Sequence, residues 1–213
     1  MRVKSNVLAL YAVAAVFAAT RPAMALDPRY PDWPCQQLKV PEISVASVWT
    51  GDSIDHVDKS QFDSPSMTDL VTRLAARRTS MEEARKLIDG FVGGAGEAKQ
   101  SRATTLFAAL FSVLNTQRDE VMSGIERFSH KEKDMAEEIR AKTRKMQQLQ
   151  DTPNSDQAEV EALVNQLAWE TRIFEERRKS LSYVCEVPVL IEKRLFDLGR
   201  AIQDSTENDT KAN

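Results

Sequence analysis

One long amphipathic run limits the possible folds of this chain more than any other feature. From Ser101 to Gln150 the sequence has no proline and a single glycine, Gly124. Its apolar residues recur at spacings of three and four, which is the heptad pattern of a coiled-coil helix. They are Phe107, Phe111, Leu114, Val121, Ile125, Phe128, Met135, Ile139, Met146 and Leu149. A helix from Thr104 to Leu149 would be about 70 Å long, so part of it must project from a globular core.

A second heptad pattern follows after a short turn. The turn is the sequence DTPNSD at 151–156, which combines a helix stop with a new N-cap. The apolar residues beyond it again keep the 3-4 spacing, and they are Val160, Leu163, Leu167, Phe174, Leu181 and Val184. Two such helices joined by a short loop favour an antiparallel hairpin. We therefore predict a coiled-coil arm over about 119–185.

Folding the chain about this turn decides which residues of the two helices face each other. Cys185 falls level with Val121, at the root of the arm. Glu132 interrupts the apolar seam with a charge, and it falls level with Arg177 and Arg178. Polar residues in a seam commonly fix its register at some cost in stability. We therefore expect Glu132 to form an ion pair with one of these two arginines.

The segments on either side of the hairpin predict a small helical base. It would contain residues 66–118 and 187–204, with Pro188 in the first turn of the last helix. The fold class is then all-α, with one helical domain over 66–204. Residues 205–213 are polar, and we predict that they form a disordered tail.

The segment before the base has a different composition. Residues 26–65 contain most of the prolines outside the N-terminal leader, and proline fixes φ and lacks an N–H donor. We therefore predict an extended strap, with a short extended run where apolar and other residues alternate over 42–49. We interpret Trp33 and Trp49 as anchors that hold the strap on the helical body. A ligand-binding platform is the alternative.

The first 25 residues have the pattern of a secretory signal peptide. A basic start precedes an apolar run, 7–19, that is too short to span a bilayer. Ala23-Met24-Ala25 has the small-x-small spacing of a cleavage site, so cleavage is predicted between Ala25 and Leu26. We expect an exported protein, most simply in a bacterial periplasm. No later segment is apolar enough to predict a membrane span.

The charge of the mature chain excludes some classes of partner. Cleavage would remove Arg2, Lys4 and Arg21 and no acid, so Lys+Arg falls from 29 to 26 against 32 Asp+Glu. The net charge then becomes −6. An acidic protein is a poor ligand for nucleic acid or for an anionic membrane surface.

The two cysteines, Cys35 and Cys185, indicate a disulfide. An even number of cysteines in an oxidising compartment is typical of a structural bond. This bond would join the strap to the root of the arm. The alternative is a pair of free thiols in a redox or metal site, but the Cys-x-x-Cys spacing of such sites is missing.

Few residues suggest catalysis or metal binding. The histidines, His56 and His130, lie in no recognisable catalytic motif. Glu126, His130 and Asp134 step by four on one helical face and could offer a metal three ligands, but they fall outside the seam, where solvated charge is the default. The aspartates of the strap lack the spacing and the glycine of a calcium loop; they are Asp52, Asp55, Asp58 and Asp63. We predict no metal, no cofactor and no enzymatic activity.

The leading hypothesis is a non-enzymatic interaction protein, such as a scaffold, an adaptor or a chaperone-like protein. Its coiled-coil arm would bind a partner protein, and homo-oligomerisation stays open. In architecture alone the chain resembles periplasmic proteins with helical-hairpin arms, including trimeric chaperones and efflux adaptors. It departs from the former in its acidic charge and from the latter because its sequence predicts no β-rich domain.

The alternative is a periplasmic helical protein that binds a small molecule or a metal cofactor. Its pocket would lie in the base among aromatic residues, which are Trp33, Trp49, Phe107, Phe111 and Phe196. An enzyme without a sequence-local motif is the third hypothesis, and the shortage of histidine disfavours it.

Overall fold

The computed structural model describes residues 27–207, and within that range every regular element is helical. The predicted signal peptide and the bond between Ala25 and Leu26 lie outside the described residues. The elements are α1 (Val45–Val48), η1 (Lys59–Asp63), α2 (Pro65–Ala75), α3 (Met81–Val92), η2 (Gly93–Ala98), α4 (Lys99–Asp151), α5 (Gln157–Val184) and α6 (Val187–Glu207).

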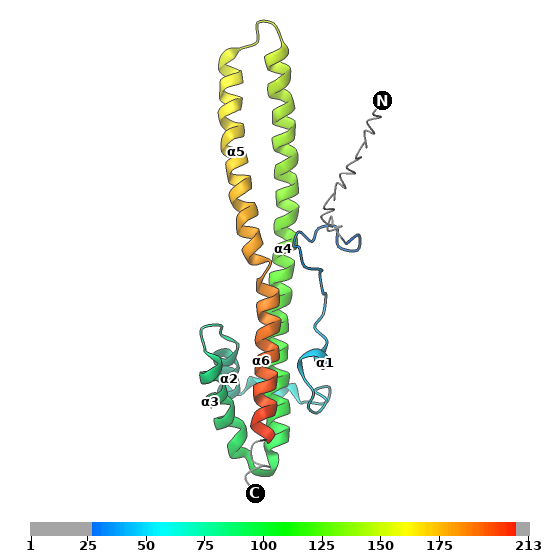
Figure 1. The fold of residues 1–213 in the computed structure, drawn as a ribbon, viewed down its shortest axis with the longest axis vertical. Helices are drawn as coiled ribbons and strands as arrows, with labels where there is room; N and C mark the ends of the chain where they lie inside the picture. The colour runs from blue at the N-terminus through cyan, green and yellow to red at the C-terminus, as the bar shows by residue number, and fades with distance from the viewer. Residues whose placement is uncertain (1–26, 208–213) are drawn as a thin grey trace, which may run out of the picture.

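Helix α4 is the axis of the molecule. It has 53 residues, which corresponds to a length of about 80 Å. Figure 1 shows α5 and α6 following each other end to end along α4, in the opposite direction. Among the helices, α5 accompanies the upper part of α4 and forms the arm with it, whereas the lower part of α4 pairs with α6 and contributes to the base. The predicted all-α fold, with a helical base and a long antiparallel hairpin, is confirmed.

The base is formed where α2 and α3 pack against α4 and α6. The two short helices begin at serine caps: the Ser64 Oγ accepts a hydrogen bond from the Met67 N–H, and the Ser80 Oγ accepts one from Glu83. Their apolar stripes meet in one buried core. The fully buried members include Leu74, Ile88, Leu106, Phe107, Leu110, Leu195, Leu198 and Ile202.

A glycine on α6 lets the strap approach this core. The Val48 carbonyl oxygen lies only 2.5 Å from the position that a Cβ on Gly199 would occupy. Because no side chain stands there, α1 packs directly on α6. Trp49, the next residue, stacks on Phe107 with ring centroids 4.3 Å apart. This tryptophan therefore anchors the strap to the base.

The structure corrects two details of the predicted boundaries. The extended run expected over 42–49 is wrong, because the Trp49 N–H bonds to the Val45 carbonyl and closes a helical turn there. That turn brings Val48 and Trp49 together into the core. The tail expected from residue 205 is wrong for its first three residues, since α6 continues to Glu207 and buries Ser205. The remaining tail residues lie outside the described range.

Among residues 27–207, no helix combines the length and the apolar composition that a membrane span requires.

Candidate functional site

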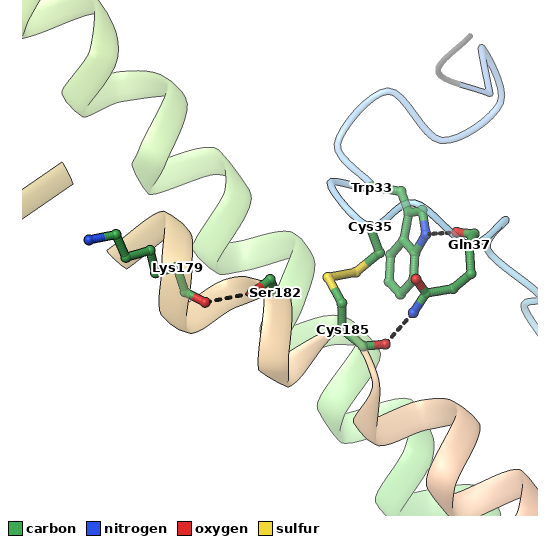
Figure 2. Close-up of a disulfide and its surroundings, with 6 residues drawn as sticks. All are labelled: Trp33, Cys35, Gln37, Lys179, Ser182 and Cys185. Atoms are coloured by element: carbon green, nitrogen blue, oxygen red, sulfur yellow. Dashed lines mark hydrogen bonds between the residues drawn. A yellow bond between two sulfur atoms is a disulfide. The ribbon is translucent and has the colours of Figure 1, made fainter. Parts of the chain in front are cut away.

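The root of the arm is fixed by a disulfide between Cys35 and Cys185, as the cysteine count predicts. Their Cα atoms are 5.6 Å apart, across a sequence separation of 150. Figure 2 shows the hydrogen bonds beside it: the Trp33 Nε1 donates to the Gln37 carbonyl at 2.7 Å, and the Gln37 amide donates to the Cys185 carbonyl. Trp33 is buried against Met122 of α4. The strap is thus held on both helices of the arm at one level.

Ion pairs continue this attachment along α4. Lys39 of the strap lies 2.6 Å from Glu126. Asp32 lies 2.6 Å from Lys133 and 2.9 Å from the His130 Nε2. The hydrogen bond from Lys133 lowers the pKa of Asp32 below its usual range. These contacts hold the strap against the side of α4 that carries Glu126, His130 and Lys133.

The same contacts engage two of the candidate metal ligands. Glu126 faces Lys39, and His130 faces Asp32, so the face of Glu126, His130 and Asp134 is directed partly at the strap. Within the described range, no group of three or more histidine, cysteine, aspartate or glutamate side chains is arranged to hold a metal ion.

The arm itself is a pair of helices with a thin seam. Val160, Leu163 and Leu167 of α5 are each 9% exposed. Ion pairs cross the seam in antiparallel order, and they are Glu132–Arg177, Lys142–Glu170 and Lys145–Glu159. The hydrogen bond from Lys142 lowers the pKa of Glu170. The seam therefore depends on charge pairs as well as on apolar contacts.

Glu132 lies where the predicted register places it, with Arg177 Nη1 3.5 Å from its Oε1. Its side chain is only 8% exposed, and neither carboxylate oxygen accepts a hydrogen bond. Burial raises the pKa of Glu132, and the positive charges of Arg177 and Arg178 offset that effect only in part. Glu132 is therefore a buried carboxylate that accepts no hydrogen bond from the described residues.

Two hollows flank the seam. The first, which we call the strap cleft, has a volume of about 830 Å³ and is lined by residues 34–37, by α4 from Ser129 to Arg140, and by residues 174–186. The second, which we call the Trp169 groove, has a volume of about 500 Å³. Its lining residues are Phe128, Trp169, Arg172, Ile173, Glu176, Arg177 and Ser180. Ile173 lines the Trp169 groove and Phe174 lines the strap cleft, and because successive helical residues point about 100° apart, the two hollows lie on different faces of α5.

The Trp169 groove exposes an aromatic side chain on the arm. Trp169 is 63% exposed. The Arg177 guanidinium lies 5.3 Å from the centroid of the Phe128 ring, and both side chains line the groove. Sequence reasoning did not single out Trp169. The available signal was a large aromatic residue outside the α5 heptad positions, two residues after Leu167.

Only three of the five aromatic residues predicted to form a pocket in the base come together. Trp49, Phe107 and Phe111 pack in the base, where Phe107 and Phe111 have centroids 6.2 Å apart. Trp33 belongs to a separate cluster at the root of the arm. Phe196 is 41% exposed on α6.

Comparison of the chain with protein-family models, with curated proteins and with solved structures finds no significant match. The arm and the two hollows beside it are therefore the features from which a function can be inferred.

Proposed function

We propose that this chain is an exported, non-enzymatic interaction protein whose α4–α5 arm binds an amphipathic helix of a partner protein in the Trp169 groove. The observation that carries this proposal is Trp169, which is 63% exposed on a helical arm that projects from the base. Phe128 and Ile173 continue its apolar surface across to α4.

The chemistry of the groove suits a helical partner. A groove between two parallel helix axes accepts a third helix, whose apolar side chains would cover the indole and the Phe128 ring. Tryptophan and arginine are the residues that most often dominate binding energy at protein interfaces. Arg172 and Arg177 border the indole here, so the groove combines an apolar centre with polar edges.

The attachment of the strap supports the same role. The disulfide, the buried Trp33 and the Lys39–Glu126 pair hold the arm where it leaves the base. A preorganised arm loses less conformational freedom when it binds. Projection and rigidity together are what a docking element needs.

Two features support an exported location. The first 25 residues have the pattern of a secretory leader, and a disulfide persists in an oxidising environment. We infer that the protein works in the periplasm or after secretion.

Photocrosslinking in cells tests the docking role. A benzophenone amino acid would replace Trp169 in one variant and Thr171 in a matched control, since Thr171 is exposed but lies on the opposite side of α5. We expect a discrete protein adduct at position 169 that is absent at position 171 and that Ile173→Glu abolishes. Identical adduct patterns at both positions, or a monomer without adducts, would contradict the proposal. An adduct with a second copy of the chain would mean that the groove mediates self-association and does not bind a different protein.

A further inference from the structure

Helix α6 carries a second apolar stripe on the side that faces away from the base. Its inner stripe is buried in the core, where Leu195 and Leu198 have no exposed surface. On the outer side, Val189, Leu190 and Phe196 stay between 41% and 49% exposed. In Figure 1, α6 lies in front of the lower part of α4, so its outer side faces the viewer. Large apolar side chains that gather on one surface often mark an interaction site.

Four charged residues lie on the same outer face. Together with Leu190 they recur at spacings of three and four, which keep residues on one side of a helix. They are Glu186, Lys193, Asp197 and Arg200. Glu186 belongs to this face because its carbonyl accepts a hydrogen bond from the Leu190 N–H and so begins the helical pattern of α6. None of the four forms an ion pair with another residue in the range 27–207.

The charges on the flanks of α6 have partners within the fold. Glu192 lies 2.6 Å from Arg118 of α4, and Asp204 lies 3.1 Å from Arg85 of α3. The neighbouring helices therefore supply partners on the flanks and leave the outer face without them. An unpaired surface charge is ordinary by itself, but these four form an ordered series beside exposed apolar side chains.

The order of the outer charges makes this face complementary to itself. From residue 186 to residue 200 they alternate as acid, base, acid, base. The same series read backwards places a base opposite every acid. A two-fold axis that relates two antiparallel helices brings the series and its reverse together. We propose that the outer face of α6 binds a second copy of this chain and forms an antiparallel, two-fold symmetric dimer.

Helix geometry supports the pairing of the charges. When the two-fold axis is level with residue 194, Glu186 lies within about 3 Å, along the helix axis, of Arg200 of the second copy. Lys193 has the same offset from Asp197 of the second copy. Each pair occurs twice because of the symmetry. The two Lys193 side chains approach each other near the axis, where the two Asp197 carboxylates offset their charge.

The apolar residues meet in the same arrangement. Leu190 lies within about 3 Å, along the axis, of Phe196 of the second copy, and Val189 within about 5 Å. Each Phe196 ring is thus covered by two aliphatic side chains of the other copy. The apolar contacts supply the attraction, and the charge pairs fix the direction and register of the helices.

The interface is small, so the dimer should be weak. Residues 186–200 span about 21 Å of helix, and one helix pair of that length buries less than the roughly 1,600 Å² of a standard interface. We expect a dissociation constant of about 10–100 μM.

Antiparallel pairing has a consequence for the arms. Each arm continues the line of α6 away from the base, so the two arms of a dimer point in opposite directions. The dimer does not depend on the docking role of the Trp169 groove, which lies on the arm and outside this interface. It would give one assembly two separate arms.

Sedimentation equilibrium of the mature, oxidised protein from about 5 to about 500 μM tests the dimer. We expect a reversible monomer–dimer equilibrium. Phe196→Glu should weaken it about tenfold or more, because a carboxylate replaces the ring at the centre of the apolar contact. The matched control is Val164→Glu, since Val164 is also 41% exposed but lies on α5 in the arm. This control should leave the association unchanged.

Charge reversals test the register. Glu186→Arg and Arg200→Glu should each weaken association about fivefold or more, because like charges then face each other twice in the dimer. Both substitutions in one chain restore unlike pairs and should recover most of the affinity. A mixture of the two single variants should form a heterodimer more tightly than either variant associates with itself. Thermal melts confirm that each variant is folded.

Three results would overturn the inference. They are a monomer throughout the concentration range, a dimer that Phe196→Glu leaves intact, and charge reversals whose effects add in the double variant where they should cancel. Crosslinking at position 169 tests the docking role by a different measurement at a different surface. The two proposals therefore succeed or fail separately.

Discussion

The base and the arm share helix α4 but surround it with different numbers of neighbours. In the base, α2, α3 and α6 all contact α4, and Leu106, Phe107 and Leu110 have no exposed surface. Among the described helices, only α5 accompanies α4 along the arm, and α4 seam residues such as Met135 and Ile139 stay half-buried. One continuous helix is thus a core element at one end and a surface element at the other.

This difference shows how the two regions are stabilised. The base is stabilised by complete apolar burial, which contributes in proportion to the area removed from water. The arm cannot enclose its side chains, so it adds charge pairs across the seam and a covalent attachment at its root. Surface that the arm leaves open is then free for binding. Three predictions test this difference between the base and the arm.

Loss of the disulfide should have the largest effect. Replacing Cys35 and Cys185 together by serine opens a loop of 150 residues, and the chain-entropy model gives a loss of about 4–5 kcal/mol in the free energy of unfolding. Urea denaturation followed by circular dichroism measures the loss. Hydrogen exchange should show that the strap and the arm root lose protection before α2 and α3 do. A loss below about 1 kcal/mol would mean that the strap is held by its other contacts.

A leucine-to-alanine substitution should lower the free energy of unfolding more in the base than in the arm. Leu110→Ala in the base should cost about 3–5 kcal/mol, because the surrounding core cannot collapse into the space. Leu163→Ala in the arm should cost about 1–2 kcal/mol, since the seam is partly solvated and can close. The urea midpoint of each variant, compared with that of the unaltered protein, measures these two losses. Equal losses would contradict the idea that base and arm are stabilised differently.

Glu132→Gln should have the smallest effect on stability and should be stabilising. Burial raises the folded-state pKa of Glu132 above its unfolded value, so the folded state binds the proton more tightly than the unfolded state does. The contribution of Glu132 to the free energy of unfolding is therefore most favourable at low pH. It falls as pH rises through the folded-state pKa of this carboxyl. At pH 7 the amide should raise the free energy of unfolding by about 1 kcal/mol, since Arg177 is partly exposed and stays hydrated.

Thermal melts between pH 4 and pH 8 check this prediction. The difference between Glu132→Gln and the unaltered protein should shrink towards acidic pH, where Glu132 is protonated. Glu138→Gln is the matched control and should show no comparable trend. A variant that is destabilised at pH 7 would show that the Glu132–Arg177 pair outweighs the cost of burial.

Local periodicity made much of the fold predictable. The 3-4 spacing along α4 and α5, the turn at 151–156 and the two cysteines are all written in the linear sequence. The register follows from folding about that turn, which predicts that Glu132 lies level with Arg177 and Arg178, and the structure pairs it with Arg177. These features are predictable because the heptad pattern and the short turn together determine how α4 and α5 pair.

Features that depend on the path of the strap were not predictable. The helical turn at Val45–Val48 forms because Trp49 stacks on Phe107 and because Gly199 leaves room for the Val48 carbonyl. The strap cleft exists only where residues 34–37 cross the two arm helices. Trp169 is conspicuous only because no third helix among the described elements covers it. These outcomes depend on long-range packing that proline content and alternation do not encode.

The distance between the two cysteines along the chain has a consequence for biogenesis. A polypeptide that crosses a membrane with its N-terminus first exposes Cys35 long before Cys185 emerges. The bond can therefore close only after most of the protein has been delivered, when α4 and α5 have met and brought the two thiols together. If the protein is exported as proposed, this disulfide forms late, and the Cys35 thiol stays unpaired, or bound to the oxidising catalyst, until Cys185 emerges.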